Sequence, residues 1–260
     1  MLLSHTMRWS IVDAPPALAP STVQVWRIDT PAFDANDCLA LLTDEERTRA
    51  DRFRHEESKA EYITGHACLR YLLKHQLQQP VAIQKSKHGK PFLAGSELAF
   101  NITHSAGTVL IAFAHCQTIG VDLEKHKPRF SDTSLHREVF APSECEALQN
   151  ASSPQQAEAM FFHLWTSKEA LLKADGRGLM LPSSSFAITF DQQQQVQLPD
   201  NTTPLHVLQL PIDKGYSAAL ALDILPTDVN LFRFQPVWLK REYNGASDNP
   251  ASLQDGYHAG

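Results

Sequence analysis

The sequence predicts an α+β fold built from two similar halves. It contains 260 residues, 43% of them hydrophobic, which is enough to form a large core. In each half a short capped helix precedes a long helix, and several strands follow the long helix. Corresponding elements are displaced by roughly 95–110 positions, and this spacing indicates a duplicated unit with a cleft between its copies. Chance agreement between two unrelated α+β segments is the alternative.

The first half is predicted from hydrophobic periodicity and from turn residues. Thr43 and the acids after it form the start of a helix that continues to about Phe53. A longer helix is expected at about Glu57–Leu77, where apolar residues recur at three- and four-residue intervals. Strands are expected at Trp26–Asp29, Val81–Lys85, Leu98–Thr103 and Val109–Ala114.

The second half repeats this order. A strand at Ile119–Glu124 opens it, Pro142 begins a short helix, and Gln156–Ala174 forms the long one. Further strands are expected at Phe186–Phe190, His206–Leu210, Ser217–Leu222 and near Asn230–Phe234, and the glutamine run 192–195 is expected in a loop. We therefore expect an N-terminal half at 1–116 and a C-terminal half at 117–240. Because periodicity ends there, a disordered tail is expected at 241–260.

Charge and cysteine content exclude several classes of protein. The chain has 23 basic and 29 acidic residues, a net charge of −6 and no dense Lys/Arg cluster, so we expect no nucleic-acid partner. The four cysteines form no CxxC pair and predict neither a zinc site nor a disulfide framework, which favours a reduced, cytoplasmic setting. The opening apolar run is too short for a signal peptide, and no run of about 18 apolar residues predicts a membrane span.

The stretch GVDLEKHKPR places two carboxylates on one side of a strand. Side chains alternate along a strand, so Asp122 and Glu124 point the same way while Val121 and Leu123 point the other. Two adjacent carboxylates repel each other unless a proton or a cation lies between them, and hard oxygen ligands suit Mg²⁺. The pair therefore predicts a metal site, with a solvated strand end as the alternative.

The long helix of the second half carries a lysine where an apolar residue is expected. In FFHLWTSKEALLKADGRGL, helical spacing aligns one apolar face made of Phe161, Leu164, Trp165 and Leu172. Lys168 falls within this face, and Glu169 and Lys173 lie together on its flank. An i, i+4 surface pair would explain the flank, and Lys168 could extend its stem toward solvent. Because an unpaired buried charge is costly, an anionic ligand beneath the helix would explain both lysines. Glu169 facing the Asp122/Glu124 pair would then complete a metal–diphosphate site.

The stretch KHGKPFLAGSELAFNITHSAG offers candidate phosphate ligands. Gly89, Lys90 and Pro91 form a tight turn, and Thr103 and His104 end the strand that follows. A lysine from the turn and polar groups at the strand end could hold phosphate oxygens. A turn histidine that caps backbone groups is the alternative.

Taken together, these stretches resemble one family. The order G-K-P, N-I-T-H-S, G-V-D-L-E and W-x-x-K-E-A-x-x-K, within roughly residues 40–190, is similar to the signature set of the 4′-phosphopantetheinyl transferases. The similarity is to their longer, two-half (Sfp-like) class. It implies a monomer whose two α+β halves are related by a pseudo-twofold axis, with coenzyme A bound between them.

The resemblance also assigns roles to single residues. It implies that Asp122, Glu124 and Glu169 coordinate Mg²⁺, or Mn²⁺, on the coenzyme A diphosphate. Glu169, Lys173 and Asp122 are the implied catalytic residues, with Glu169 as the base and Lys173 stabilising phosphate charge as the bond to 3′,5′-ADP breaks. The cofactor-binding residues that it implies are Arg49, His88, Gly89, Lys90, Pro91, Asn101, Thr103, His104, Asp122, Lys168 and Lys173.

Three residues depart from the family pattern. Glu46 and Glu61 stand where basic residues are common, and His66 stands where an arginine is common. Arg49 matches a basic position that contacts the 3′-phosphate. The resemblance therefore leaves open how much of the 3′-phosphate contact the first half supplies.

The implied reaction moves the phosphopantetheine arm of coenzyme A to a serine of an apo acyl or peptidyl carrier protein. Because such carriers are small acidic helical domains, we expect docking near Arg177, Leu179, Met180 and Leu181, just after the long helix. The alternative for this segment is a helix end that leads into core leucines. The alternatives for the function are a Mg²⁺-dependent phosphodiesterase or nuclease, which would favour a more basic chain, and a non-catalytic module that binds carrier proteins or nucleotides.

Overall fold

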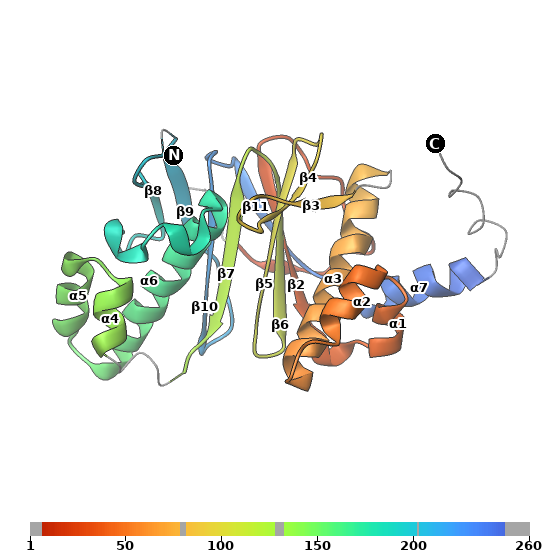
Figure 1. Ribbon diagram of the computed structural model, residues 1–260, viewed down its shortest axis with the longest axis horizontal. Helices are drawn as coiled ribbons and strands as arrows, with labels where there is room; N and C mark the ends of the chain where they lie inside the picture. Colours follow the sequence, from red (N-terminus) through yellow and green to blue (C-terminus); the bar gives the residue numbers. More distant parts are fainter. Residues whose placement is uncertain (1–6, 79–81, 128–132, 202, 248–260) are drawn as a thin grey trace.

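The computed structural model describes residues 7–78, 82–127, 133–201 and 203–247, which form two helix-covered sheets that meet at the centre of the molecule (Figure 1). In these residues the first sheet has the strand order β1-β11-β2-β6-β5, and the second has the order β7-β10-β9-β8. The strands of the first sheet are Trp9–Ser10 (β1), Asp228–Arg233 (β11), Thr22–Asp29 (β2), Thr108–His115 (β6) and Leu98–Ser105 (β5). Those of the second are Ile119–Lys125 (β7), Tyr216–Leu222 (β10), Leu205–Gln209 (β9) and Gln193–Val196 (β8). A small hairpin is formed by Ile83–Lys85 (β3) and Pro91–Leu93 (β4).

Helices cover the outer side of each sheet (Figure 1). The first sheet is covered by Ala35–Leu39 (α1), Asp44–Ala50 (α2) and Glu56–Leu77 (α3). On the side of the second sheet lie Thr133–Val139 (α4), Pro142–Gln149 (α5) and Pro154–Asp175 (α6). The last helix, Pro236–Ser247 (α7), contacts α1. No helix in the described ranges combines the length and hydropathy needed to cross a bilayer.

The predicted α+β fold of two similar halves is confirmed. The long helices α3 and α6 each contain 22 residues and begin at Glu56 and Pro154. Strand β6 lies antiparallel between β2 and β5, and strand β10 lies antiparallel between β7 and β9. Each half therefore combines three antiparallel strands with a long helix, which packs on β5 and β6 in the first half and on β7, β10 and β9 in the second.

The helix boundaries follow from the capping residues in the sequence. At α2, Thr43 Oγ1 accepts the Glu46 N–H at 3.3 Å, and the Glu46 carboxylate accepts the Thr43 N–H at 2.9 Å, which forms a capping box at the predicted helix start. At α6, the Ser153 side chain caps the first turn, and Gly176 ends the helix with a φ of 82°. Glycine tolerates this left-handed conformation, so the helix stops where the sequence indicates.

The C-terminal part of the described chain returns to the first half. Strand β11 pairs parallel with β2, with Leu231 opposite Val25. Trp238 of α7 lies edge-on to Trp26, 5.9 Å between ring centroids, inside the first core. The boundary predicted between residues 116 and 117 falls between β6 and β7, but the first sheet includes a strand from beyond it. The predicted tail at 241–260 overlaps α7 up to Ser247, and residues 248–260 lie outside the described residues.

Two predictions of local structure in the second half are wrong. The segment 186–190 forms no strand, because its polar backbone groups bind side chains: the Phe186 carbonyl accepts from Lys168, and the Ile188 N–H donates to Glu144. The buried alternation of Phe186 and Ile188 therefore reflects packing beneath α6 rather than a ladder. The glutamine run, predicted as a loop, instead forms β8 at the edge of the second sheet, where polar side chains can face solvent.

Helix α6 approaches β7 closely. Strand β7 in turn lies beside β5 of the first sheet, and the line along which these two strands meet is called the seam. A β-carbon at Gly120 would lie 2.5 Å from the Ala174 nitrogen and closer still to the Ala170 carbonyl oxygen. Across the seam, Asn101 Oδ1 on β5 accepts the Val121 N–H of β7 at 2.9 Å. This side chain joins the two sheets at the point where α6 ends.

Replacing Gly120 with alanine should lower the free energy of unfolding by about 3 kcal/mol, because the helix backbone cannot move aside without repacking the core. Urea unfolding followed by circular dichroism measures the change. Gly215→Ala is the matched control, because Gly215 has a φ of 85° but open space where the new methyl group would lie, and its cost is limited to about 1–2 kcal/mol of backbone strain. Equal costs at the two positions would contradict the close approach.

Candidate active site

Six of the predicted site residues lie around one pocket of about 360 Å³ at the seam between the sheets. Strand β5 contributes Thr103 and His104, strand β7 contributes Asp122 and Glu124, and helix α6 contributes Glu169 and Lys173. Ile102, Leu123 and Trp165 complete the lining. Strand alternation places the two acids of β7 on one face, and helical spacing places Glu169 and Lys173 one above the other. The structure therefore joins the two halves at this group of side chains.

Lys173 lies at the centre of the polar contacts in the pocket. Its Nζ atom is 2.6 Å from Asp122 Oδ1 and donates to Thr103 Oγ1 at 3.0 Å and to the Val121 carbonyl at 3.3 Å. Thr103 Oγ1 in turn lies 3.3 Å from Asp122 Oδ1. One ammonium group thus links α6 to both strands of the seam.

The three carboxylates of the pocket, Asp122, Glu124 and Glu169, carry more negative charge than Lys173 can neutralise. Asp122 is buried, and its Oδ2 atom has no hydrogen-bond partner in the described structure. Burial and then the nearby Asp122 charge raise the pKa of both Glu124 and Glu169, and Lys173 opposes this effect. A cation would bind the unpartnered Asp122 oxygen and would reduce the repulsion between the carboxylates. Three carboxylates suit a hard divalent ion. Within the described ranges, however, no three such side chains are already arranged as a metal-binding group.

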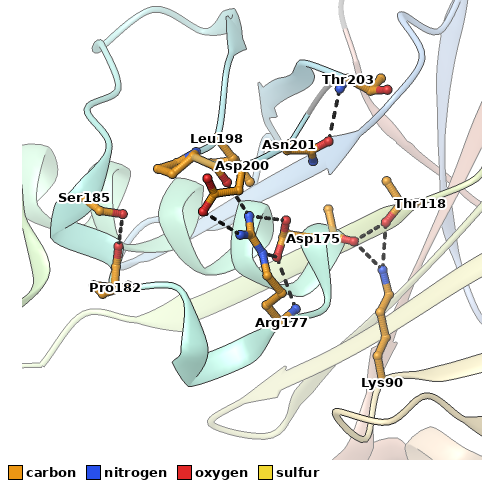
Figure 2. Close-up of polar contacts among 12 residues, drawn as sticks. Lys90, Thr118, Asp175, Arg177, Pro182, Ser185, Leu198, Asp200, Asn201 and Thr203 are labelled. Atoms are coloured by element: carbon orange, nitrogen blue, oxygen red, sulfur yellow. Dashed lines mark hydrogen bonds and ion pairs between the residues drawn. The ribbon is translucent and has the colours of Figure 1, made fainter.

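The G-K-P turn lies at the C-terminal end of α6, just beyond Lys173. Lys90 Nζ donates to the Ala174 carbonyl at 2.7 Å and to Thr118 Oγ1 at 2.9 Å (Figure 2). Burial lowers the pKa of Lys90 to about 8. His88 is exposed, and Gly89 has the positive φ of a turn, 85°. The structure brings the turn of the first half to the end of α6, but it does not bring Lys90 to the acids.

Lys168 lies away from the pocket, contrary to its predicted contact with the cofactor. Only 1% of it is exposed, and its Nζ atom is 2.9 Å from Glu144 Oε2. It also donates to the carbonyls of Ser183 and Phe186 at 2.7 and 2.6 Å. The lysine on the apolar face of α6 therefore has a protein partner in α5 and ties down the segment that follows the helix.

A second pocket, of about 650 Å³, lies beside α2 and contains the predicted phosphate contact Arg49. Its lining is Glu45, Thr48, Arg49, Arg52, Phe53 and Lys85. The Arg49 guanidinium lies over the Tyr62 ring, 5.5 Å from the centroid. Of the departures from the family pattern, Glu46 binds Arg70 at 2.6 Å, and His66 Nδ1 lies 3.0 Å from the Tyr62 carbonyl.

The predicted docking segment is only partly exposed. Met180 is 75% exposed, whereas Leu181 is buried among apolar residues of α6 and the second sheet. The expectation that Leu181 faces a partner is therefore wrong. Arg177 binds Asp175 through Nε at 2.7 Å and the Pro199 carbonyl at 2.7 Å, with Asp200 nearby (Figure 2). Its charge is therefore largely balanced within the chain.

Sequence reasoning missed several residues around these pockets. Trp165, assigned to the core, lines the acidic pocket, and its i, i+4 spacing from Glu169 was the available signal. Arg52 and Lys85 line the second pocket, and no pattern in the sequence connects them with Arg49. Ser105 Oγ lies 3.4 Å from Glu124 Oε2, a contact that forms only because β5 and β7 lie side by side.

Comparisons with known proteins cover both halves. The family model described as 4′-phosphopantetheinyl transferase superfamily matches residues 118–221, and that described as 4′-phosphopantetheinyl transferase, N-terminal, matches residues 25–116. The chain is 30% identical over 205 residues to the 4′-phosphopantetheinyl transferase Sfp of Bacillus subtilis, over 76% of this chain and 90% of that protein. It is 34% identical over 234 residues to the 4′-phosphopantetheinyl transferase HetI of a Nostoc species, over 85% of this chain and 95% of that protein. The chain therefore belongs to the 4′-phosphopantetheinyl transferase superfamily, in its longer two-half class, and is an enzyme of that family.

Proposed function

We propose that the enzyme transfers the 4′-phosphopantetheine arm of coenzyme A to a serine hydroxyl of an apo acyl or peptidyl carrier protein, with Mg²⁺, and releases 3′,5′-ADP. The observation that carries this proposal is the convergence of Asp122, Glu124, Glu169 and Lys173 on one pocket at the seam. Both halves of the pocket come from one chain, so a monomer suffices, and we place its action in the cytoplasm.

The donor set of the pocket fits a divalent cation. Asp122 Oδ2 is buried and unpartnered, and repulsion by Asp122 contributes to the raised pKa of Glu124 and Glu169. These three side chains would hold Mg²⁺, with Mn²⁺ as a substitute. When bound, the ion would supply charge neutralisation on the coenzyme A diphosphate.

The side chains of α6 account for the transfer step. The serine oxygen forms a bond to the phosphorus that carries pantetheine, and the bond from that phosphorus to 3′,5′-ADP breaks, the leaving group keeping the electron pair. Glu169 accepts the serine proton, because the hydroxyl must lose this proton as its oxygen attacks. Lys173 donates to the phosphate oxygens as their charge shifts to the leaving group.

The nucleotide and the carrier occupy the regions around this pocket. Thr103 and His104, which lie on β5, bind phosphate oxygens of coenzyme A. Arg49, which lies in the pocket beside α2, binds one of its phosphate groups. Lys90 and Pro91 lie against the adenine, next to the end of α6. The carrier docks near the exposed Met180, in the segment that follows α6. Lys168 has no part in this proposal, because its ammonium group is buried with Glu144.

One assay tests the function. The protein is incubated with coenzyme A, Mg²⁺ and an apo carrier protein, and the carrier is analysed by mass spectrometry for gain of the arm at its serine. Removing Mg²⁺ with a chelator should abolish the gain. Cleavage of a phosphodiester or nucleic-acid substrate without carrier modification would favour the phosphodiesterase alternative and overturn the proposal.

Replacing Lys173 with alanine should lower turnover about a hundredfold or more, because a preorganised cation opposite the transferring phosphate is lost. The variant should still fold, because the Lys173 side chain is 30% exposed, but it should lose stability, because Asp122 remains buried without its partner. Steady-state rates and far-ultraviolet circular dichroism measure the two effects. A variant that unfolds would give Lys173 a structural role instead.

A further inference from the structure

Glu61 is an acidic residue at a position where basic residues are common in the family, and both of its carboxylate oxygens are hydrogen-bonded. It lies on α3 and is 4% exposed. Oε2 lies 2.6 Å from Nδ1 of His104, and Oε1 accepts the Gly107 N–H at 2.6 Å. Burial alone would raise the pKa of Glu61, but the bonds from His104 and Gly107 outweigh it and lower the pKa. The side chain is therefore an ionised carboxylate with two fixed contacts.

These contacts determine which nitrogen of His104 carries a hydrogen. An ionised carboxylate can only accept hydrogen bonds, so Nδ1 must be the donor. The Gly107 contact holds the second oxygen and prevents the carboxylate from turning away. The imidazole itself lines the acidic pocket and is 41% exposed, and its other nitrogen, Nε2, makes no hydrogen bond within the described part of the chain.

We propose that Glu61 is a positioning residue that holds the Nδ1–H of His104 and so directs Nε2 at a phosphate group of coenzyme A. The proposal rests on the proposed function, because coenzyme A supplies the phosphate. An imidazole between a carboxylate and a phosphate donates from both nitrogens and bridges two anions. Outer carboxylates orient ligating histidines at metal sites in the same way. Glu61 thus contributes to phosphate binding indirectly, through the imidazole of His104.

Glu61→Gln tests the proposal without changing the size of the side chain. The Gly107 N–H still needs an acceptor, so the glutamine oxygen stays there and its NH₂ group faces Nδ1. Nδ1 must then accept, and the hydrogen of the neutral ring moves to Nε2. Nitrogen-15 NMR of the imidazole, assigned through His104→Gln, should show hydrogen on Nδ1 in the wild-type protein and none there in the variant.

Calorimetry with Mg²⁺ and no carrier measures the effect on binding. The variant should bind coenzyme A about tenfold more weakly, because a charge-assisted bond becomes a neutral one, a difference of about 1.4 kcal/mol. His104→Gln should cause a similar loss, and the double variant should add little to it. Asp51→Asn is the control: it removes an exposed carboxylate that binds Lys59 at 2.9 Å, and it should leave the affinity unchanged.

A parallel titration with dephospho-coenzyme A identifies the phosphate. A loss confined to coenzyme A assigns the 3′-phosphate, and a loss with both ligands assigns the diphosphate; either supports the proposal. Hydrogen remaining on Nδ1 in Glu61→Gln, its absence from Nδ1 in the wild type, or unchanged affinity would overturn it. Failure of the wild-type protein to bind coenzyme A would contradict the proposed function, and the NMR result would still decide the orientation of the ring.

Discussion

Replacing Asp122 with asparagine should lower the rate of carrier modification about a thousandfold, which corresponds to a loss of about 4 kcal/mol. Asparagine keeps the size of the side chain but removes the charge that binds Lys173 through Oδ1 at 2.6 Å. It also removes the charge at Oδ2, the buried oxygen without a protein partner. Steady-state rates measured at saturating Mg²⁺ and coenzyme A give the effect, and calorimetry should show weakened Mg²⁺ binding independently of turnover.

Asp213→Asn is a matched control for this result. Asp213 binds Arg27 at 2.6 Å, the same distance as the Asp122–Lys173 contact, but it does not line the acidic pocket. We expect its turnover to stay within about twofold of wild type. If Asp122→Asn modified a carrier at a near-normal rate with Mg²⁺ present, the proposed mechanism would have to be abandoned.

Replacing Lys168 with methionine should lower the free energy of unfolding by about 3–5 kcal/mol, because Glu144 would remain as an unpaired buried charge. The carbonyls of Ser183 and Phe186 would lose their donor as well. The affinity for coenzyme A in the variant that remains folded should change little. Denaturant unfolding and calorimetry measure the two quantities separately.

Lys59→Met provides the comparison for an exposed ion pair. Lys59 lies on the other long helix and binds Asp51 at 2.9 Å, but Asp51 is largely exposed, so the loss of stability should be far smaller than for Lys168→Met. A Lys168→Met variant with normal stability and lost coenzyme A binding would instead support the sequence interpretation, in which Lys168 contacts the ligand.

The elements and the acids of the pocket could be predicted because their signals are local. The period of α6, its cap at Ser153 and its end at Gly176 all lie in neighbouring positions of the chain. Strand alternation likewise places Asp122 and Glu124 on one face without knowledge of the fold. Their convergence with Glu169 followed from the family resemblance rather than from periodicity, because it depends on how α6 crosses β7.

The errors concern residues whose environment comes from distant segments. The sequence marks Lys168 as unusual, but its partner Glu144 belongs to another helix, and Glu144 also binds the Ile188 N–H. That one carboxylate explains both the buried lysine and the absence of a strand at 186–190. Leu181 shows the same limit, because an apolar residue after a helix has the same pattern whether it is buried or faces a partner.

The parallel pairing of β11 with β2 has a consequence for the order in which the chain can complete its structure. During synthesis β2 emerges early, but the strand that covers one of its edges is about 200 positions later. Until β11 arrives, that edge presents unpaired backbone groups to any other extended chain. The two halves repeat the same order of elements, yet the first cannot complete its sheet without β11. The first sheet is therefore completed only after β11 has been synthesised, later than every strand of the second sheet in the described residues.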